Sequence, residues 1–158
     1  MKILFKQSPK AMVKLIQGPQ KGFPTDSGWD LRAPETITLK KGERQTVDLE
    51  TQFQIEVTGL KMKILNFFGI GIEGQIRPKS GRSMNGLDVE IGTVDESYTG
   101  SVRCTITNTT NKTIKIEEEE KLCQIVFIPV FNRLQVVRGT VKQSKTRGSD
   151  GFGSTSLY

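Results

Sequence analysis

The sequence contains no histidine, only two cysteines and no long apolar run among its 158 residues. Without histidine, every mechanism that uses imidazole as a base, a proton shuttle or a zinc ligand is excluded. Catalysis must therefore use carboxylates, hydroxyls, arginines or an added metal ion. The missing apolar run excludes a membrane-spanning helix, so length and composition predict one compact soluble domain with no membrane partner.

The cysteines and the first residues indicate the compartment. Cys104 and Cys123 lie in separate apolar, strand-like runs without the paired spacing of a metal site or a redox motif, so we expect buried free thiols. Residues 1–10 place only three apolar residues between charges, too few for a secretory signal. These features predict a cytoplasmic, intracellular protein without disulfides.

The formal net charge is +6, but the lysines and arginines are scattered along the chain. They form no basic stripe interleaved with aromatic residues, which would be the usual signature of a nucleic-acid interface. The charge therefore fits a solvated surface or a site for an anionic small molecule. A non-enzymatic nucleic-acid-binding β-barrel is the weaker alternative, and it would bind DNA with a steep salt dependence.

Strand signals cover most of the chain. Short β-branched segments, often alternating, are separated by Gly, Pro, Asn or Asp at intervals of roughly eight to twelve residues, the spacing of a sandwich or barrel. No stretch carries a helical stripe of about twelve residues, so we predict an all-β domain with one short helix near residues 81–86. The expected strands are residues 12–16, 36–40, 44–49, 52–57, 101–108, 112–117 and 123–131.

Some segments depart from this pattern. Residues 59–74 are rich in Gly, Phe and Ile, and they fit a hairpin, an exposed arm or a strand interrupted by glycines. Residues 117–121 read Glu-Glu-Glu-Glu-Lys, and this run of acids predicts an exposed turn. The nearly continuous apolar run 123–131 predicts a strand buried on both faces.

The C-terminal residues 145–158 are rich in Gly, Ser and Thr and cannot build a packed core, so we expect a flexible arm after a β-barrel domain of residues 1–144. Phe152 between two glycines suits a lid that stacks a ring on a planar ligand. The glycines let backbone amides approach anionic oxygens, and Arg147, Ser154 and Thr155 supply further donors. A disordered tail is the alternative.

Three other segments are candidate sites, and each has an ordinary structural explanation. Around Gly81, a proline-fixed turn offers a lysine, a hydroxyl and a close backbone approach, although Pro-x-Ser-Gly is often only a turn. Asp95 precedes a turn with Tyr98 three residues on, which fits either a base beside a stacked ring or an Asp-initiated turn. Asp30 and Arg32 share one strand face, where an ion pair would also explain them.

Five segments match an ordered set of motifs. Residues 27–31 read Ser-Gly-Trp-Asp-Leu against Ala-Gly-x-Asp-Leu, and residues 78–81 read Pro-Lys-Ser-Gly against Pro-Arg-Ser-Gly. Residues 92–100 match Gly-x-Ile/Val-Asp-x-x-Tyr-x-Gly throughout, and residues 121–125 match Arg-x-x-Gln with lysine in place of arginine. Residues 147–155 match Arg-Gly-x-x-Gly-Phe-Gly-Ser-Thr throughout. Together these motifs resemble those of the trimeric dUTP pyrophosphatase (dUTPase) family.

The resemblance implies a jelly-roll-like β-barrel, assembled as a homotrimer whose active sites draw residues from all three subunits. The implied reaction is hydrolysis of dUTP to dUMP and pyrophosphate, with water attacking the α-phosphorus and Asp95 deprotonating that water. Mg²⁺ would bridge the triphosphate, and Asp30 would hold it through water. The product dUMP would supply thymidylate synthesis.

The resemblance also implies the substrate contacts. Residues 88–94 alternate and are expected to form one strand, which corresponds to the family's β-hairpin pocket for uracil. Tyr98 would lie under the deoxyribose, and Phe152 of the arm would cover the base. The phosphate chain would be held by Ser80, Gln124, Arg147, Ser154 and Thr155. The implied substrate-binding residues are Lys79, Ser80, Gly81, Gly92, Val94, Tyr98, Gln124, Arg147, Phe152, Gly153, Ser154 and Thr155.

This sequence departs from the family pattern in several places. Lys79 and Lys121 replace arginines, which keeps the charge but loses the bidentate fork, and Arg77 or Arg82 would have to compensate. Glu90 occupies the uracil hairpin, where an inward side chain would alter base specificity.

Residues 59–74 are longer than the usual link between the flanking strands, so we expect an extra hairpin on the trimer surface that contacts a protein partner. Two alternatives share the fold. One is a dCTP deaminase relative, including a bifunctional deaminase, and the other is a regulatory protein that uses nucleotide binding as a switch.

Overall fold

The computed structural model describes residues 2–13, 17–56 and 60–142. These residues form short strands and three short helices, of which the longest has eight residues. None of the helices in this part of the chain has the length and apolar character needed to cross a membrane. The elements are β1 (Lys2–Gln7), α1 (Pro9–Val13), β2 (Gly28–Arg32), β3 (Ile37–Leu39), β4 (Arg44–Asp48), β5 (Thr51–Glu56), α2 (Leu60–Phe67), β6 (Gly71–Arg77), α3 (Ser80–Met84), β7 (Leu87–Val89), β8 (Gly92–Val94), β9 (Arg103–Asn108), β10 (Ile114–Ile116) and β11 (Lys121–Val130).

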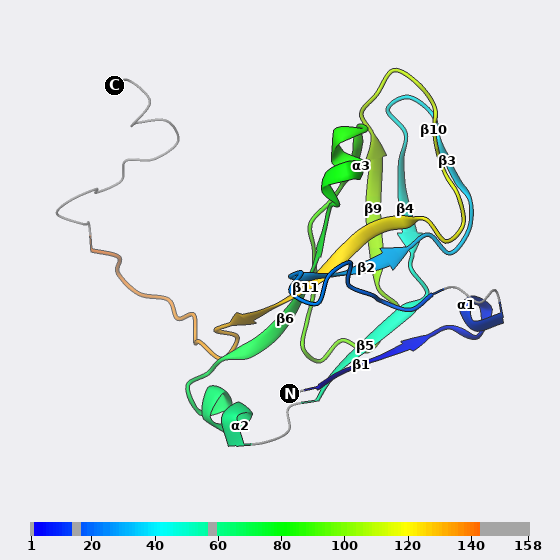
Figure 1. The fold of residues 1–158 in the computed structure, drawn as a ribbon. Coiled ribbons are helices and arrows are strands. Elements are labelled where there is room, and N and C mark those ends of the chain that lie inside the picture. Colours follow the sequence, from blue (N-terminus) through cyan, green and yellow to red (C-terminus); the bar gives the residue numbers. More distant parts are fainter. Residues whose placement is uncertain (1, 14–16, 57–59, 143–158) are drawn as a thin grey trace.

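The strands form two sheets and two ribbons, with antiparallel pairing throughout (Figure 1). The larger sheet has the order β2-β11-β6-β8, and the smaller one has the order β4-β9-β7. The ribbons are β1-β5 and β3-β10. Neighbours in each sheet come from distant parts of the chain, as expected of a jelly-roll-like arrangement.

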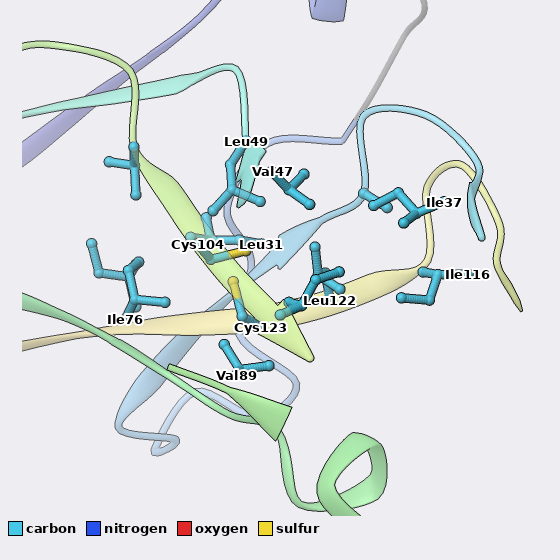
Figure 2. Packing of buried hydrophobic residues seen from close by; sticks show 14 of the residues in the cluster. Leu31, Ile37, Val47, Leu49, Ile76, Val89, Cys104, Ile116, Leu122 and Cys123 are labelled. Carbon is cyan, nitrogen blue, oxygen red and sulfur yellow. The ribbon is translucent and has the colours of Figure 1, made fainter. Parts of the chain in front are cut away.

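Side chains from both sheets and from the ribbons meet in one hydrophobic core (Figure 2). Alternation supplies it: on β3, for example, Ile37 and Leu39 are buried while Thr38 is exposed. Cys104 of β9 and Cys123 of β11 are both buried free thiols, which confirms the prediction. Hydrogen bonding with Cys104, together with burial, raises the pKa of Cys123 well above its usual value, so this thiol stays protonated and packs as an apolar group.

Strand β11 is buried only along its first half. Leu122, Cys123 and Ile125 are buried, whereas the residues from Val126 onward are partly or fully exposed. The first half pairs with β2, Gln124 to Val126 pair with both β2 and β6, and beyond Val126 only β6 pairs with it. The predicted strand is therefore confirmed, but its burial on both faces is correct for one half only.

Two other strand predictions need correction. Residues 12–16 were expected to form a strand, but Met12 lies in α1 and residues 14–16 are outside the described part. Pro9 opens this helix, and the amide of Met12 donates to the carbonyl of Ser8 at 3.0 Å. Residues 88–94, expected as one strand, divide into β7 and β8 on different sheets. Strand β1 was not predicted.

The segment 59–74 is not a hairpin. It contains α2 and the start of β6, and Figure 1 shows the helix at the outer end of that strand. Gly69, with φ of +73°, ends the helix. The amides of Gly69 and Ile70 donate to Asn66 and Leu65 at 3.0 and 2.9 Å, the pattern of a Schellman cap. The predicted short helix near residues 81–86 is confirmed as α3.

Candidate active site

Three of the matched motifs converge around the first half of β11. Asp30 on β2 lies opposite Gln124 in the β2-β11 register, and Gln124 lies opposite Arg77 on β6. Lys79 lies two residues beyond the end of β6, and its side chain reaches back to Asp30 on β2. Lys79 Nζ contacts Asp30 Oδ1, and Lys121 Nζ lies 2.8 Å from Asp30 Oδ2. Residues separated by up to 91 positions thus form one cluster of two cations around a single carboxylate.

Asp30 is only 4% exposed, and its environment fixes its charge. Burial alone raises its pKa, but the hydrogen bonds and positive charges of Lys121 and Lys79 outweigh that effect, so the pKa lies below the usual 3.8. The expected ion pair with Arg32 is not what holds this carboxylate, because Arg32 Nη1 donates to the carbonyl of Glu119 at 2.7 Å. Both Asp30 oxygens are occupied by the two lysines that replace arginines of the family motifs.

Gln124 is fixed beside this cluster. Its Nε2 donates to the carbonyl of Pro78 at 2.9 Å, joining β11 to the Pro-Lys-Ser-Gly segment. A Cβ at Gly28 would come within 3 Å of the Gln124 side-chain amide, so a larger residue there would displace this amide. Ser80 opens α3 and is exposed, and Gly81 follows it in an open position.

A cavity of about 360 Å³ opens next to the cluster. Its lining residues are Lys79, Gly81, Arg82, Asn85, Glu120 and Lys121. Of the two arginines expected to compensate for the lysines, Arg82 lines this cavity but is paired with Glu120 at 3.1 Å, whereas Arg77 donates to Gln75 at 2.6 Å. The two lysines are therefore the main positive groups here.

The motif containing Asp95 builds a second site. Val94 is buried at the end of β8, Asp95 is exposed, and the amide of Tyr98 donates to the carbonyl of Asp95 at 3.0 Å to close the turn. The Tyr98 hydroxyl donates to the carbonyl of Ser101 at 2.9 Å, and a side chain at Gly100 would clash with the ring. A cavity of about 340 Å³ lies here, lined by Ile76, Gly92, Thr93, Val94, Tyr98, Ser101, Val102 and Arg103.

These two sites are not adjacent within one chain. Val94 pairs with Gly74, whereas Gln124 pairs with Arg77, three residues and about 10 Å farther along β6. Asp95 continues in the direction away from Arg77, because β8 is antiparallel to β6. It lines a separate open cavity of about 480 Å³ with Glu96, Ser97, Asn132 and Arg133.

Comparison with known proteins accounts for this set of motifs. The dUTPase family model matches residues 15–156 of this chain. The chain belongs to the dUTPase family. It is 34% identical over 161 aligned positions to the deoxyuridine 5'-triphosphate nucleotidohydrolase of Clostridium novyi, covering 99% of this chain and 100% of that protein. It is 32% identical to the enzyme of the same name from Nautilia profundicola, covering 82% and 83%.

Solved dUTPase structures confirm the jelly-roll-like fold. The dUTPase of Staphylococcus bacteriophage 80alpha, solved as a mutant with dUpNHpp, superposes with a TM-score of 0.77 at 20% identity, covering 97% of each chain. The dUTPase of phage phi11 of S. aureus, described for its species-specific insert, gives a TM-score of 0.70 at 18% identity, covering 92% of this chain and 99% of that one.

In this dUTPase, Glu90 does not line the cavity beside Tyr98. Its Oε1 lies 2.6 Å from Arg44 Nη2, so the carboxylate is bound toward β4, and the side chain is 45% exposed. The division of residues 88–94 into two strands explains this, because Glu90 lies between β7 and β8 where the chain passes from one sheet to the other. The sequence alone left the direction of this side chain open.

Some predicted site residues are outside the described part of the chain, and the sequence analysis missed some residues that lie near the site. Arg147, Phe152, Gly153, Ser154 and Thr155, with the whole arm 145–158, are outside the described residues. Ser101 and Arg103 line the second cavity although no motif includes them, and their closeness to the Asp95 motif was the available signal. Glu96, at a variable position of the Asp95 motif, was also missed, and so were Asp48, Asn132 and Arg133, which carried no sequence signal.

Proposed function

We propose that this dUTPase hydrolyses dUTP to dUMP and pyrophosphate by attack of water on the α-phosphorus. The observation that carries the proposal is the exposed Asp95, which directly follows Val94, a residue that lines a cavity together with Gly92 and Tyr98. The names of the relatives favour the same activity over deamination of dCTP. A cytoplasmic enzyme of this kind would lower dUTP and supply dUMP for thymidylate synthesis.

In the proposed mechanism, Asp95 accepts a proton from the attacking water as the new bond to the α-phosphorus forms. The bond from that phosphorus to the bridging oxygen breaks, and pyrophosphate leaves with the bonding electrons. Backbone groups near Gly92 and Val94 would bind the uracil edge, and Tyr98 would pack under the deoxyribose. A rigid backbone wall can reject a methyl group more strongly than the loss of contact alone allows.

The phosphate chain would bind at the first cluster. Lys79 and Lys121 would exchange part of their contact with Asp30 for phosphate oxygens, and Gln124 lies beside them with a fixed amide. Ser80 and Gly81 offer a hydroxyl and an open backbone at the start of α3. The arm would complete the site through Arg147, Phe152, Gly153, Ser154 and Thr155.

The residues of this chain suit Mg²⁺ only when the nucleotide supplies most of its ligands. The described residues contain no group of three acidic, histidine or cysteine side chains able to hold a metal ion, and Asp30 already has two lysine partners. Mg²⁺ characteristically keeps several waters and binds through phosphates and one or two carboxylates. Asp30 would therefore contact the ion through water, and the ion would neutralise phosphate charge.

We also propose a homotrimer with shared active sites. Asp95 is separated from Asp30, Lys79 and Gln124 along the sheet. This separation supports the arrangement, because one chain alone does not bring the proposed catalytic carboxylate next to the phosphate cluster. A cyclic trimer with heterologous contacts joins different surfaces of neighbouring chains in a closed ring. The Asp95 region of one subunit would then face the phosphate cluster of another.

Segment 59–74 favours a second, regulatory function. Phe67 and Phe68 of this segment are 84% and 64% exposed, with ring centroids 5.4 Å apart, and Ile64 is also exposed. Exposed aromatic groups of this kind are typical of protein interaction sites. We propose that this surface binds a protein partner. Arg133 would connect it to the Asp95 turn.

The decisive experiment measures pyrophosphate release with Mg²⁺ from dUTP, dCTP, dTTP and UTP. We expect release from dUTP alone, and a loss of at least about a hundredfold in kcat for Asp95→Asn. Asp26→Asn, at a half-buried aspartate that accepts a hydrogen bond from the amide of Phe23, is the control and should keep full activity. Binding of dUTP without turnover by the unaltered protein would overturn the proposal in favour of a nucleotide-sensing protein.

A further inference from the structure

The wall of the cavity beside Tyr98 is attached to a carboxylate from another part of the chain. Asp48, the last residue of β4, lies opposite Arg103 in the β4-β9 register. Its Oδ1 accepts hydrogen bonds from the Ser101 hydroxyl and, at 2.9 Å, from the backbone amide of Glu50. Its Oδ2 lies 3.5 Å from Arg103 Nε. Asp48 therefore holds two of the residues that line this cavity.

Ser101 transmits this attachment to Tyr98. The Ser101 hydroxyl is bound by Asp48, while its carbonyl accepts the hydrogen bond of the Tyr98 hydroxyl at 2.9 Å. The glycine at position 100 leaves room for the ring, so the phenol lies against its own turn. The position of the ring therefore depends on the position of Ser101.

The backbone around Asp48 is itself well fixed. Beyond β4, the amide of Leu49 donates to the carbonyl of Val102 at 2.9 Å, and the amide of Val102 donates to that of Thr51 at 2.8 Å. The backbone amide of Glu50 donates a hydrogen bond to the Asp48 side chain and so closes an Asx turn. This turn accommodates the left-handed backbone conformation of Glu50, whose φ is 51°. Asp48 thus projects from a rigid corner between β4 and β5.

The charge of Asp48 is also maintained. Burial alone raises its pKa, but the Ser101 hydroxyl, the Glu50 amide and the Arg103 guanidinium together bring the pKa below the usual value. An ionised carboxylate can only accept hydrogen bonds, so the Ser101 hydroxyl must point toward it. The Tyr98 hydroxyl donates separately to the carbonyl of Ser101.

We propose that Asp48 is a positioning residue for sugar selection, acting through Ser101 on Tyr98. The inference rests on the proposed function, in which Tyr98 packs under the deoxyribose. A ring held in place leaves no room for a 2'-hydroxyl, whereas a ring free to move admits the ribonucleotide. Asp48 therefore contributes to the preference for dUTP over UTP, although it does not touch the nucleotide.

The test compares kcat, KM and equilibrium binding of dUTP and UTP for the unaltered protein, Asp48→Ala and Asp48→Asn. We expect Asp48→Ala to reduce the dUTP-to-UTP ratio of kcat/KM about tenfold, with a higher KM for dUTP and a kcat within about twofold. Asparagine keeps an acceptor for Ser101, so Asp48→Asn should retain most of the preference. Ser101→Ala removes the hydroxyl that Asp48 binds and should lower the dUTP-to-UTP ratio in the same direction, so an unchanged ratio there overturns the inference even if Asp48→Ala does not fold.

Glu117→Ala is the matched control. Glu117 likewise pairs with a cation, Lys115 at 2.7 Å, and accepts from a hydroxyl, Thr36 at 3.1 Å, but it follows the β3-β10 ribbon. It should leave the nucleotide preference unchanged. An unchanged dUTP-to-UTP ratio in both Asp48 variants, or an equal loss for both nucleotides, would overturn the inference. If the unaltered protein binds dUTP but does not hydrolyse it, the binding ratio still tests Asp48, and only the proposed hydrolysis fails.

Discussion

At the scale of single residues, the most informative feature is the carboxylate of Asp30 between two lysines. Both lysines stand where the resembling motifs have arginine, and each offers a single ammonium group in place of a planar fork. Here they meet on one buried carboxylate, which holds their charges at the mouth of the cavity near α3. Substrate phosphate would therefore compete with Asp30 for the lysines, a competition that the motif comparison alone did not indicate.

The lowered pKa of Asp30 predicts an acid-dependent loss of stability. Because the pKa is lower in the folded protein than in the unfolded chain, the contribution is fully present above about pH 4 and disappears as the pH falls through the folded value. Asp30→Asn should lower the free energy of unfolding at pH 7 by about 2 kcal/mol. Between pH 5 and pH 3, the unfolding free energy of Asp30→Asn should also change less than that of the unaltered protein. Urea unfolding of both proteins at the two pH values measures this difference.

Equal slopes for both proteins would contradict the assignment of this contribution to Asp30. Asp48 and Glu50 also have lowered pKa values, so the unaltered protein loses stability in acid from several groups. Only the difference between the two proteins isolates Asp30.

At the scale of elements, helix α2 is joined to the turn that carries Asp95. Arg133 Nη1 donates to Asn66 Oδ1 at 3.0 Å, and Arg133 Nη2 lies 4.0 Å from Glu96 Oε2. Asn132 Nδ2 donates to the same Glu96 oxygen at 2.9 Å. A side chain at Gly71 would clash with both Asn132 and Glu96, so the first residue of β6 makes this contact possible.

We therefore predict that Arg133→Ala alters catalysis more than stability. The side chains of this pair are partly exposed, so the free energy of unfolding should fall by less than about 1 kcal/mol. Loss of the connection should reduce kcat for dUTP about threefold or more, because Glu96 adjoins Asp95. Steady-state kinetics and urea unfolding measure the two quantities, with the exposed Arg138→Ala as the control.

Replacing Phe67 and Phe68 together by serine tests the exposed aromatic surface separately from the contacts of α2 with Arg133. These rings are exposed, so the double variant should keep its oligomeric state and its turnover of dUTP. Loss of the trimer in this variant would contradict a peripheral role for the segment.

At the scale of the whole molecule, the division of the candidate site between two regions of one chain has a direct consequence. Asp95 and the cluster around Asp30 lie at different levels of the β6 strand, so the proposed shared site requires a complementary surface for each region. A closed ring of identical chains supplies such surfaces without any further component.

Subunit mixing tests this arrangement. Asp95→Asn chains and Lys79→Ala chains should each be nearly inactive alone. If Asp95 and Lys79 of one site come from different subunits, random mixed trimers should regain about a quarter of the unaltered activity. The measurement is dUTP turnover after the two variants are unfolded, mixed and refolded, with the molar mass determined by light scattering. Mixed trimers without recovered activity would contradict shared sites.

Much of the molecule could be predicted from local sequence patterns. Alternation and turn residues indicated most strands, because neighbouring positions on a strand face opposite sides. The apolar context of Cys104 and Cys123 indicated buried thiols, and the ordered motifs indicated the family and placed Asp30, Lys79 and Gln124 among its site residues. Helices α1 and α2 were missed because they are short, and the caps that end them matter more than periodicity at such lengths.

The sequence by itself determined which chemical groups this dUTPase has, because the residue types in the motifs do not depend on how distant segments meet. Only the tertiary structure decided their partners. Asp30 meets Lys79 and Lys121, Glu90 turns to Arg44, and Asp48 holds Ser101 across 53 positions of the chain. These contacts follow from the order of strands in the sheets, and that order is set by packing of the whole core rather than by any local segment.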